Sequence, residues 1–165
     1  MVLSGPRIRL RPLEPGDRAR VREILAAPDV SRWWGDPDEE TDDLLVVEEG
    51  HQAYAIELGG ETVGVIQSWE ELERRYRHAG IDLALHPDHY GRGLGAEAIR
   101  VLARHLFAQG HHRLTIDPAA HNARAIHVYE KLGFRRVGLL RAYEQALDGT
   151  WHDCLLLDLL NGELS

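Results

Sequence analysis

The chain has 165 residues, of which 44% are hydrophobic and 28% charged, with 19 Lys and Arg against 27 Asp and Glu. This composition fits one globular domain over residues 1–165. The net charge of −8 disfavours nucleic acid as a partner and favours a small cationic molecule, although it can equally reflect solubility alone. Because no apolar run reaches membrane-spanning length and residues 1–11 lack a signal-peptide core, we expect no membrane contact. A single cysteine suits a reducing compartment, so we expect a cytoplasmic protein.

Hydrophobic periodicity and turn residues predict strands and helices along the first half of the chain. The predicted elements are a strand at 8–13, a helix that Asp17 caps and Pro28 ends, a helix around 44–49, and strands at 52–58 and 62–69 joined by a Gly59-Gly60 hairpin. Residues 36–43 and 70–73 form two acidic segments between these elements. Each acidic segment can either bind cations or form a solvated surface.

The second half of the chain continues the alternation of strands and helices. It predicts a strand at 81–85, a helix from Leu94 to about Ala108, a strand at 114–117, a helix from Asn122 to Gly133, and strands from Phe134 and at 150–160. Hairpins combined with interspersed helices indicate a mixed sheet in an α/β domain.

Three glycines lie between the strand at 81–85 and the following helix, namely Gly91, Gly93 and Gly95. Glycine lets the backbone approach a bulky ligand, and a helix N-terminus offers free N–H groups to an anion, so the stretch predicts a phosphate-binding loop. It is not a Walker loop, because Ala96-Glu97 stands where Lys-Ser/Thr is needed, and the glycine spacing differs from that of dinucleotide-binding loops. An ordinary glycine-rich turn is the alternative.

Two segments resemble the GNAT acetyltransferase family. Residues 90–95, Tyr-Gly-Arg-Gly-Leu-Gly, resemble its pyrophosphate loop Gln/Arg-x-x-Gly-x-Gly/Ala, with Tyr90 where Gln or Arg is commonest. Residues 122–134 resemble its Asn-x-x-Ala-x-x-x-Tyr-Glu-x-x-Gly-Phe signature. The resemblance extends over residues 8–159. It implies acetyl-CoA as cofactor and a GNAT fold, a mixed and mostly antiparallel twisted sheet of about six to seven strands flanked by about four helices.

Within this family the chain is similar to aminoglycoside 6'-N-acetyltransferases. The similar segments are Trp33-Trp34-Gly35, Gly80-Ile81-Asp82, Asp117-Pro118 and Asn122-x-Arg124-Ala125-Ile126. The similarity implies that a primary amine of an aminoglycoside accepts the acetyl group, as in antibiotic resistance. The segment 67–80 is shorter than in those enzymes, where it helps to form the substrate cleft, so the acceptor stays open.

Two residues are candidates for proton transfer. Asp82 lies inside an apolar strand, where partial burial would raise its pKa toward that of a working base. A salt bridge to a residue such as Arg77 would be the structural alternative. The resemblance places the Tyr129 hydroxyl near the cofactor sulfur, as the acid that protonates the leaving thiolate, and the alternative is a buried aromatic with a satisfied hydroxyl.

The resemblance also implies the residues that bind the two substrates. The cofactor-binding residues are Leu83 and Leu85 with their backbone groups, Tyr90, Gly91, Arg92, Gly93, Leu94, Gly95 and Ala96 of the loop, and Asn122. Asn122 can act as a helix cap at the same time. The expected acceptor-binding residues are Trp33, Trp34, Asp82 and Asp117.

Other residue types limit the chemistry further. Cys154 is the only cysteine, so an internal disulfide is excluded, and its apolar surroundings indicate core packing rather than a nucleophile. The ten histidines show no ligand spacing, so we expect no metal.

The resemblance leaves other functions open. Direct transfer to a siderophore hydroxylysine precursor, a polyamine or a protein N-terminus is the second hypothesis, and a non-catalytic acyl-CoA sensor is the third. Retention of Asp82 and Tyr129 argues against the sensor. We expect a monomer or a homodimer.

Overall fold

A computed structural model describes all 165 residues and contains one eight-stranded sheet and five α-helices. The strands are β1 (Leu3–Ser4), β2 (Ile8–Pro12), β3 (His51–Leu58), β4 (Glu61–Glu71), β5 (His78–Leu85), β6 (Arg113–Ile116), β7 (Arg135–Gln145) and β8 (Trp151–Leu160). The helices are α1 (Arg18–Ala26), α2 (Pro28–Trp34), α3 (Pro37–Leu44), α4 (Leu94–Ala108) and α5 (Ala123–Lys131). None of these helices has both the length and the hydropathy needed to span a bilayer.

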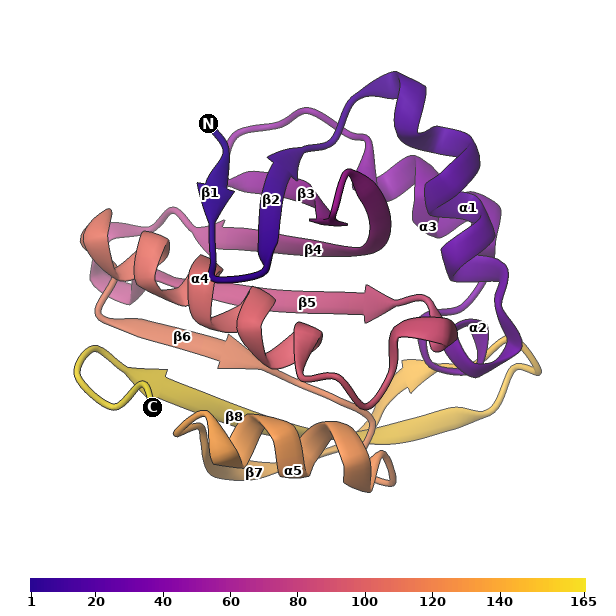
Figure 1. Ribbon diagram of the computed structural model, residues 1–165. Coiled ribbons are helices and arrows are strands. Elements are labelled where there is room, and N and C mark those ends of the chain that lie inside the picture. Colours follow the sequence, from indigo (N-terminus) through magenta and orange to yellow (C-terminus); the bar gives the residue numbers. More distant parts are fainter.

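The sheet has the strand order β1-β2-β3-β4-β5-β6-β8-β7, and every neighbouring pair is antiparallel except β5 and β6. These two parallel strands pair only at Ala79–Leu114 and Gly80–Thr115 and then diverge (Figure 1). The carboxyl-terminal half of β5 therefore pairs with β4 on one side and faces an open gap on the other.

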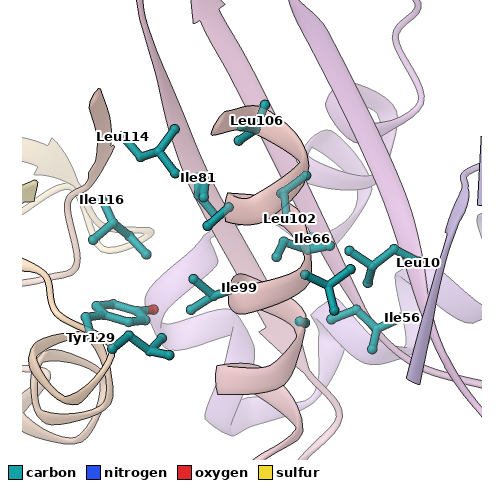
Figure 2. Close-up of a cluster of buried hydrophobic side chains, with 14 of the residues drawn as sticks. Leu10, Ile56, Ile66, Ile81, Ile99, Leu102, Leu106, Leu114, Ile116 and Tyr129 are labelled. Carbon is teal, nitrogen blue, oxygen red and sulfur yellow. The ribbon is translucent and has the colours of Figure 1, made fainter. Parts of the chain in front are cut away.

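Helices cover both faces of the sheet. α4 and α5 pack on one face, where side chains such as Ile99 and Leu102 of α4 meet Ile66 and Ile81 of the sheet (Figure 2). α1, α2 and α3 contribute to a smaller apolar cluster on the other face, which includes Ala84 of β5. Side chains alternate between the two faces along β5, so Asp82 points to the same face as Ala84 and opposite to Ile81.

The predicted α/β class and the mostly antiparallel sheet are confirmed, with eight strands instead of the expected six to seven and five helices instead of about four. The short strand β1 adds to the sheet, and α2 was not predicted. The helix predicted at 44–49 was wrong, because α3 ends at Leu44. α3 begins after Asp36, whose carboxylate accepts N–H groups of Asp38 and Glu39, so the acidic segment itself forms the helix.

Candidate active site

A cavity of about 520 Å³ lies at the gap between β5 and β6 and is lined by 27 residues. Every residue predicted for the site lines it except Arg92, which is exposed. The lining includes Trp33, Trp34, Asp82, Leu83, Leu85, Tyr90, Gly91, Gly93, Leu94, Gly95, Ala96, Asp117, Asn122 and Tyr129. Residues from β5, the β6–α5 connection and four helices thus meet at one place.

The glycine loop (residues 90–96) ends as an uncapped helix N-terminus. Gly93 is the N-cap of α4 with a left-handed φ of 73°, and no side chain caps the helix. The first intrahelical bond runs from the Glu97 N–H to the Gly93 carbonyl, at 3.1 Å, so the N–H groups of the three preceding helical residues have no helical partner. These residues, 94–96, line the cavity, where free N–H groups and the helix dipole suit a phosphate.

Cations gather near this loop although the whole chain is acidic. The Arg124 guanidinium lies over the Tyr90 ring, 4.0 Å from its centroid, and both residues line the cavity. The Arg7 guanidinium donates to the Arg92 carbonyl at 2.8 Å. Arg124 was part of the sequence segment Asn122-x-Arg124-Ala125-Ile126. The contact of Arg124 with Tyr90 was not predictable from that segment, because it depends on how α5 packs beside the loop.

The opposite end of the cavity is acidic and consists of Asp82, Asp117, Glu40 and Glu144. Burial, followed by the charge of Asp117, raises the pKa of Asp82 to about 8. Burial, followed by the charges of Asp43 and Glu144, raises the pKa of Glu40 to about 7. Burial also raises the pKa values of Asp117 and Glu144. This acidic end disfavours further negative charge and suits a ligand with several ammonium groups.

Asp82 has no cationic partner. Its Oδ1 accepts the N–H of Leu83 at 3.0 Å, and no arginine, lysine or histidine forms an ion pair with it. Arg77, the partner considered above, instead donates to the Gln109 carbonyl at 3.3 Å. The carboxyl group therefore keeps capacity to bind an ammonium group or to accept a proton.

Tyr129 is buried on α5, with its ring in the apolar cluster beside Ile99 and Ile116 (Figure 2). Burial, followed by the charges of Asp82 and Asp117, raises the pKa of its hydroxyl above the ordinary value. The hydroxyl therefore keeps its proton at neutral pH and is available as a donor.

α2 connects the two sides of the gap. The Trp34 Nε1–H donates to the Leu83 carbonyl of β5 at 3.2 Å. The Trp33 ring contacts the His121 ring of the β6–α5 connection, with 4.9 Å between centroids. Two aromatic rings of α2 therefore line the cavity and contact both β5 and the β6–α5 connection.

The family assignment follows from comparison with known proteins. Residues 7–135 match the family described as an acetyltransferase (GNAT) domain. The chain belongs to the GNAT acetyltransferase family. It is therefore an acetyl-CoA-dependent N-acetyltransferase, as the sequence motifs predicted.

Relatives of this GNAT enzyme differ in their acceptors. It is 31% identical over 155 residues to aminoglycoside N(6')-acetyltransferase type 1 of Klebsiella pneumoniae, with 82% of this chain and 77% of the relative covered. It is 27% identical over 160 residues to spermidine N(1)-acetyltransferase of Escherichia coli K12, with 92% and 85% covered. The structure of AAC(6')-Ib in complex with paromomycin and acetyl-CoA has a TM-score of 0.76 at 26% identity, covering 94% of each chain. Small amines are thus acceptors among the relatives, and the acceptor of this chain is a separate question.

Backbone geometry shows which groups of the GNAT enzyme can meet an extended ligand in the gap. The His86 N–H bonds the Val63 carbonyl at 2.8 Å, so even-numbered residues along β5 bond β4 and odd-numbered ones face away. Leu83 and Leu85 therefore direct their backbone groups toward the gap. Asn122 Oδ1 accepts the Ala125 N–H at 3.3 Å, which confirms the cap and leaves its amide NH₂ without a protein partner.

Cys154 is buried in this GNAT enzyme, as predicted. Burial, followed by the charges of Glu144 and Asp117, raises the pKa of its thiol to about 12. A thiol with this pKa stays protonated near neutral pH and is a poor nucleophile. No group of three or more His, Cys, Asp or Glu side chains has the arrangement of a metal site.

The sequence did not single out Glu40 and Glu144 as site residues. Glu40 belongs to the acidic segment 36–43, for which a solvated surface was an equal alternative, and the α3 helix turns it toward the cavity. Glu144 reaches the cavity from β7 at the edge of the sheet, and nothing in its local sequence indicates a site.

Proposed function

We propose that this enzyme transfers the acetyl group of acetyl-CoA directly to a primary amine of an aminoglycoside, within a ternary complex of enzyme and both substrates. The observation that carries the proposal is the acidic end formed by Asp82, Asp117, Glu40 and Glu144 beside the gap. An aminoglycoside carries several ammonium groups on sugar rings, and several carboxyl groups can bind them together. Trp33 and Trp34 both line the cavity and supply aromatic surface for such rings, and the Arg32 guanidinium lies 4.6 Å from the Trp33 centroid.

The two substrates are expected to enter from opposite faces of the sheet. In this proposal the pyrophosphate binds the free N–H groups of residues 94–96, and the pantetheine arm lies along Leu83 and Leu85 with a hydrogen bond from Asn122. These groups lie on the side of α4 and α5. Asp82 and Glu40 lie on the opposite side. The gap between β5 and β6 is therefore where the acetyl group and the amine meet.

Acetyl-CoA supplies an activated thioester, and the chain must move two protons and bind one developing negative charge. Asp82 accepts a proton from the acceptor ammonium group, directly or through water. Protonation of Asp82 weakens its hold on the Leu83 N–H, which then becomes a donor to the oxyanion. As the C–S bond breaks, Tyr129 donates its proton to the leaving sulfur and recovers one, through water, from the nitrogen that has formed the C–N bond. No covalent enzyme intermediate is needed.

A polyamine is the second candidate acceptor. The acidic end would also bind a polyamine, and the spermidine N(1)-acetyltransferase of Escherichia coli is a relative. The paired tryptophans favour the aminoglycoside, because a flexible alkyl chain gains less from a flat ring than a sugar does.

Steady-state kinetics over an acceptor panel tests the proposal. The panel contains tobramycin, kanamycin, spermidine, lysine and a short peptide with a free N-terminus, each with acetyl-CoA. We expect the highest kcat/KM with an aminoglycoside, and a raised acceptor KM with unchanged acetyl-CoA KM in Asp117→Asn. Efficient turnover of spermidine, lysine or the peptide with neither aminoglycoside acetylated would overturn the acceptor and leave the family activity in place.

A further inference from the structure

The turn between β1 and β2 crosses α4 (Figure 1), and Arg7 in this turn bonds Glu97 of α4 and the Arg92 carbonyl of the glycine loop without lining the cavity. We propose that Arg7 is a positioning residue for acetyl-CoA, because it orients the Arg92–Gly93 peptide toward the cofactor and neutralises Glu97 behind the loop. The inference rests on the proposed placement of the pyrophosphate on this loop.

Arg7 makes two connections with one guanidinium group. Its Nη1 donates to the Arg92 carbonyl at 2.8 Å, and its Nε donates to Glu97 Oε2 at 2.8 Å. A Cβ atom built on Gly93 would lie 3.5 Å from Arg7 Nη2, so the guanidinium rests directly against the loop. Arg7 itself does not line the cavity, so its influence on a ligand passes through the loop.

The first connection fixes a peptide plane. In a trans peptide the C=O and the following N–H point in opposite directions. Because the Arg92 carbonyl points to Arg7, the N–H of Gly93 points away from Arg7, toward the cavity that Gly93 lines. Gly93 has φ of 73°. Because glycine adopts positive and negative φ about equally well, its own backbone preference does not fix the orientation of this peptide, and an external hydrogen bond is needed to hold it. Arg7 thereby adds one oriented N–H to those of residues 94–96.

The second connection neutralises a buried carboxylate in the first turn of α4. Glu97 is only 4% exposed and accepts the backbone N–H groups of Arg7 at 2.7 Å and Ile8 at 3.0 Å. Burial alone would raise the pKa of Glu97, but these bonds and the Arg7 guanidinium lower it, so the group is ionised. A carboxylate near an anion site repels the ligand unless a cation balances it. Arg7 supplies that cation.

The test compares acetyl-CoA with S-acetylpantetheine, which has the thioester but lacks the pyrophosphate and adenosine. The variants are Arg7→Gln and Arg7→Lys, because lysine keeps the charge beside Glu97 but lacks the fork that reaches both oxygens. Arg9→Gln is the matched control, since Arg9 lies on the same segment, is similarly exposed (59% against 49%) and pairs with Glu57 away from the loop.

We expect Arg7→Lys, which keeps the charge beside Glu97 but lacks the fork, to raise the KM for acetyl-CoA about tenfold, as loss of a charge-assisted hydrogen bond predicts. Arg7→Gln, which also loses the charge, should raise this KM further, with kcat within about twofold in both variants. The kcat/KM for S-acetylpantetheine and all constants of Arg9→Gln should stay at the wild-type values. An unchanged acetyl-CoA KM in the folded Arg7→Lys protein would overturn the inference, and so would an equal loss with S-acetylpantetheine.

Gly93→Val separates failure of this inference from failure of the proposed function. If Gly93→Val weakens acetyl-CoA binding but the Arg7 variants do not, only the role of Arg7 is wrong. If none of these variants changes acetyl-CoA binding, the pyrophosphate binds elsewhere, and the proposed cofactor placement fails together with the inference.

Discussion

The ionisation of Asp82 decides at which pH the site can accept a proton. Burial beside Asp117 raises its pKa to about 8, so the carboxyl group is protonated below this pH and becomes a base above it. We expect kcat/KM for the acceptor to rise with pH through about 8, because this ratio reports ionisations of the free enzyme and free acceptor. Asp82→Asn should lower kcat/KM and remove this ionisation from the profile.

The pH profile needs an acceptor whose own amine titrates well away from 8, so that the two ionisations separate. In Asp82→Asn only the titration of the acceptor amine should remain. A variant with reduced activity but the same inflection near pH 8 would show that another group is the base.

Tyr129 is the second residue whose protonation matters, and its raised pKa keeps the hydroxyl protonated over the working range. Tyr129→Phe removes the proposed proton donor and keeps the ring in its apolar cluster. We expect kcat to fall by about 10²–10⁴, the usual contribution of a general acid, while calorimetry shows unchanged CoA affinity. A fall of less than about threefold would mean that water protonates the sulfur or that the residue is structural.

At the scale of elements, the glycine loop and α4 were predictable because their signals are local. The glycines, the uncapped helix start and the apolar face of α4 follow one another within residues 91–106. α2 was missed because Pro28 was interpreted as the end of α1, whereas proline also suits the first turn of a new helix. The position of α3 was predicted wrongly because this acidic helix has too few apolar residues to produce a helical pattern of hydrophobicity.

The candidate site was likewise predictable only where its residues belong to a local sequence motif. Residues of the loop and of α5 were identified by motif, whereas Glu40 and Glu144 come from α3 and β7 and meet only through tertiary packing. Arg7 was missed for the same reason, since ninety positions separate it from Glu97.

The glycine loop permits a direct test at its left-handed position. Gly93→Val places a β-branched side chain at φ of 73°, with its Cβ 3.5 Å from Arg7 Nη2, and so strains the loop whose N–H groups are proposed to bind pyrophosphate. We expect the acetyl-CoA Kd to rise at least tenfold by calorimetry, about 1.4 kcal/mol, because the loop must shift or close. Gly162→Val is the control, since Gly162 has φ of 101° and open space around it far along the chain. Equal CoA affinity in folded Gly93→Val and wild-type proteins would contradict the placement.

For the molecule as a whole, the two ends of the cavity differ in their titratable groups. Arginines cluster near the glycine loop and carboxyl groups form the acidic end, in a chain with net charge −8. At physiological ionic strength the screening length is about 8 Å, so salt weakens attraction between charges that lie farther apart than this. The attraction of a polycation by the excess negative charge of the chain acts over such distances and is therefore sensitive to salt. We therefore expect the acceptor KM to rise with salt more steeply than the acetyl-CoA KM.

The check is a potassium chloride series at fixed pH, with lysine as an acceptor of lower charge. A larger salt effect on lysine than on tobramycin would contradict long-range attraction by the acidic end.

In the proposed function the two substrates enter from opposite faces of the sheet, and the acetyl group passes directly from one to the other. If both bind together at the gap, initial velocities measured over a grid of acetyl-CoA and tobramycin concentrations give intersecting lines in double-reciprocal plots. Incubation with acetyl-CoA alone should leave the mass of the enzyme unchanged, because the Cys154 thiol is buried and its pKa is raised to about 12. Parallel lines, together with an acetylated enzyme that passes its acetyl group to tobramycin, would contradict transfer within a ternary complex.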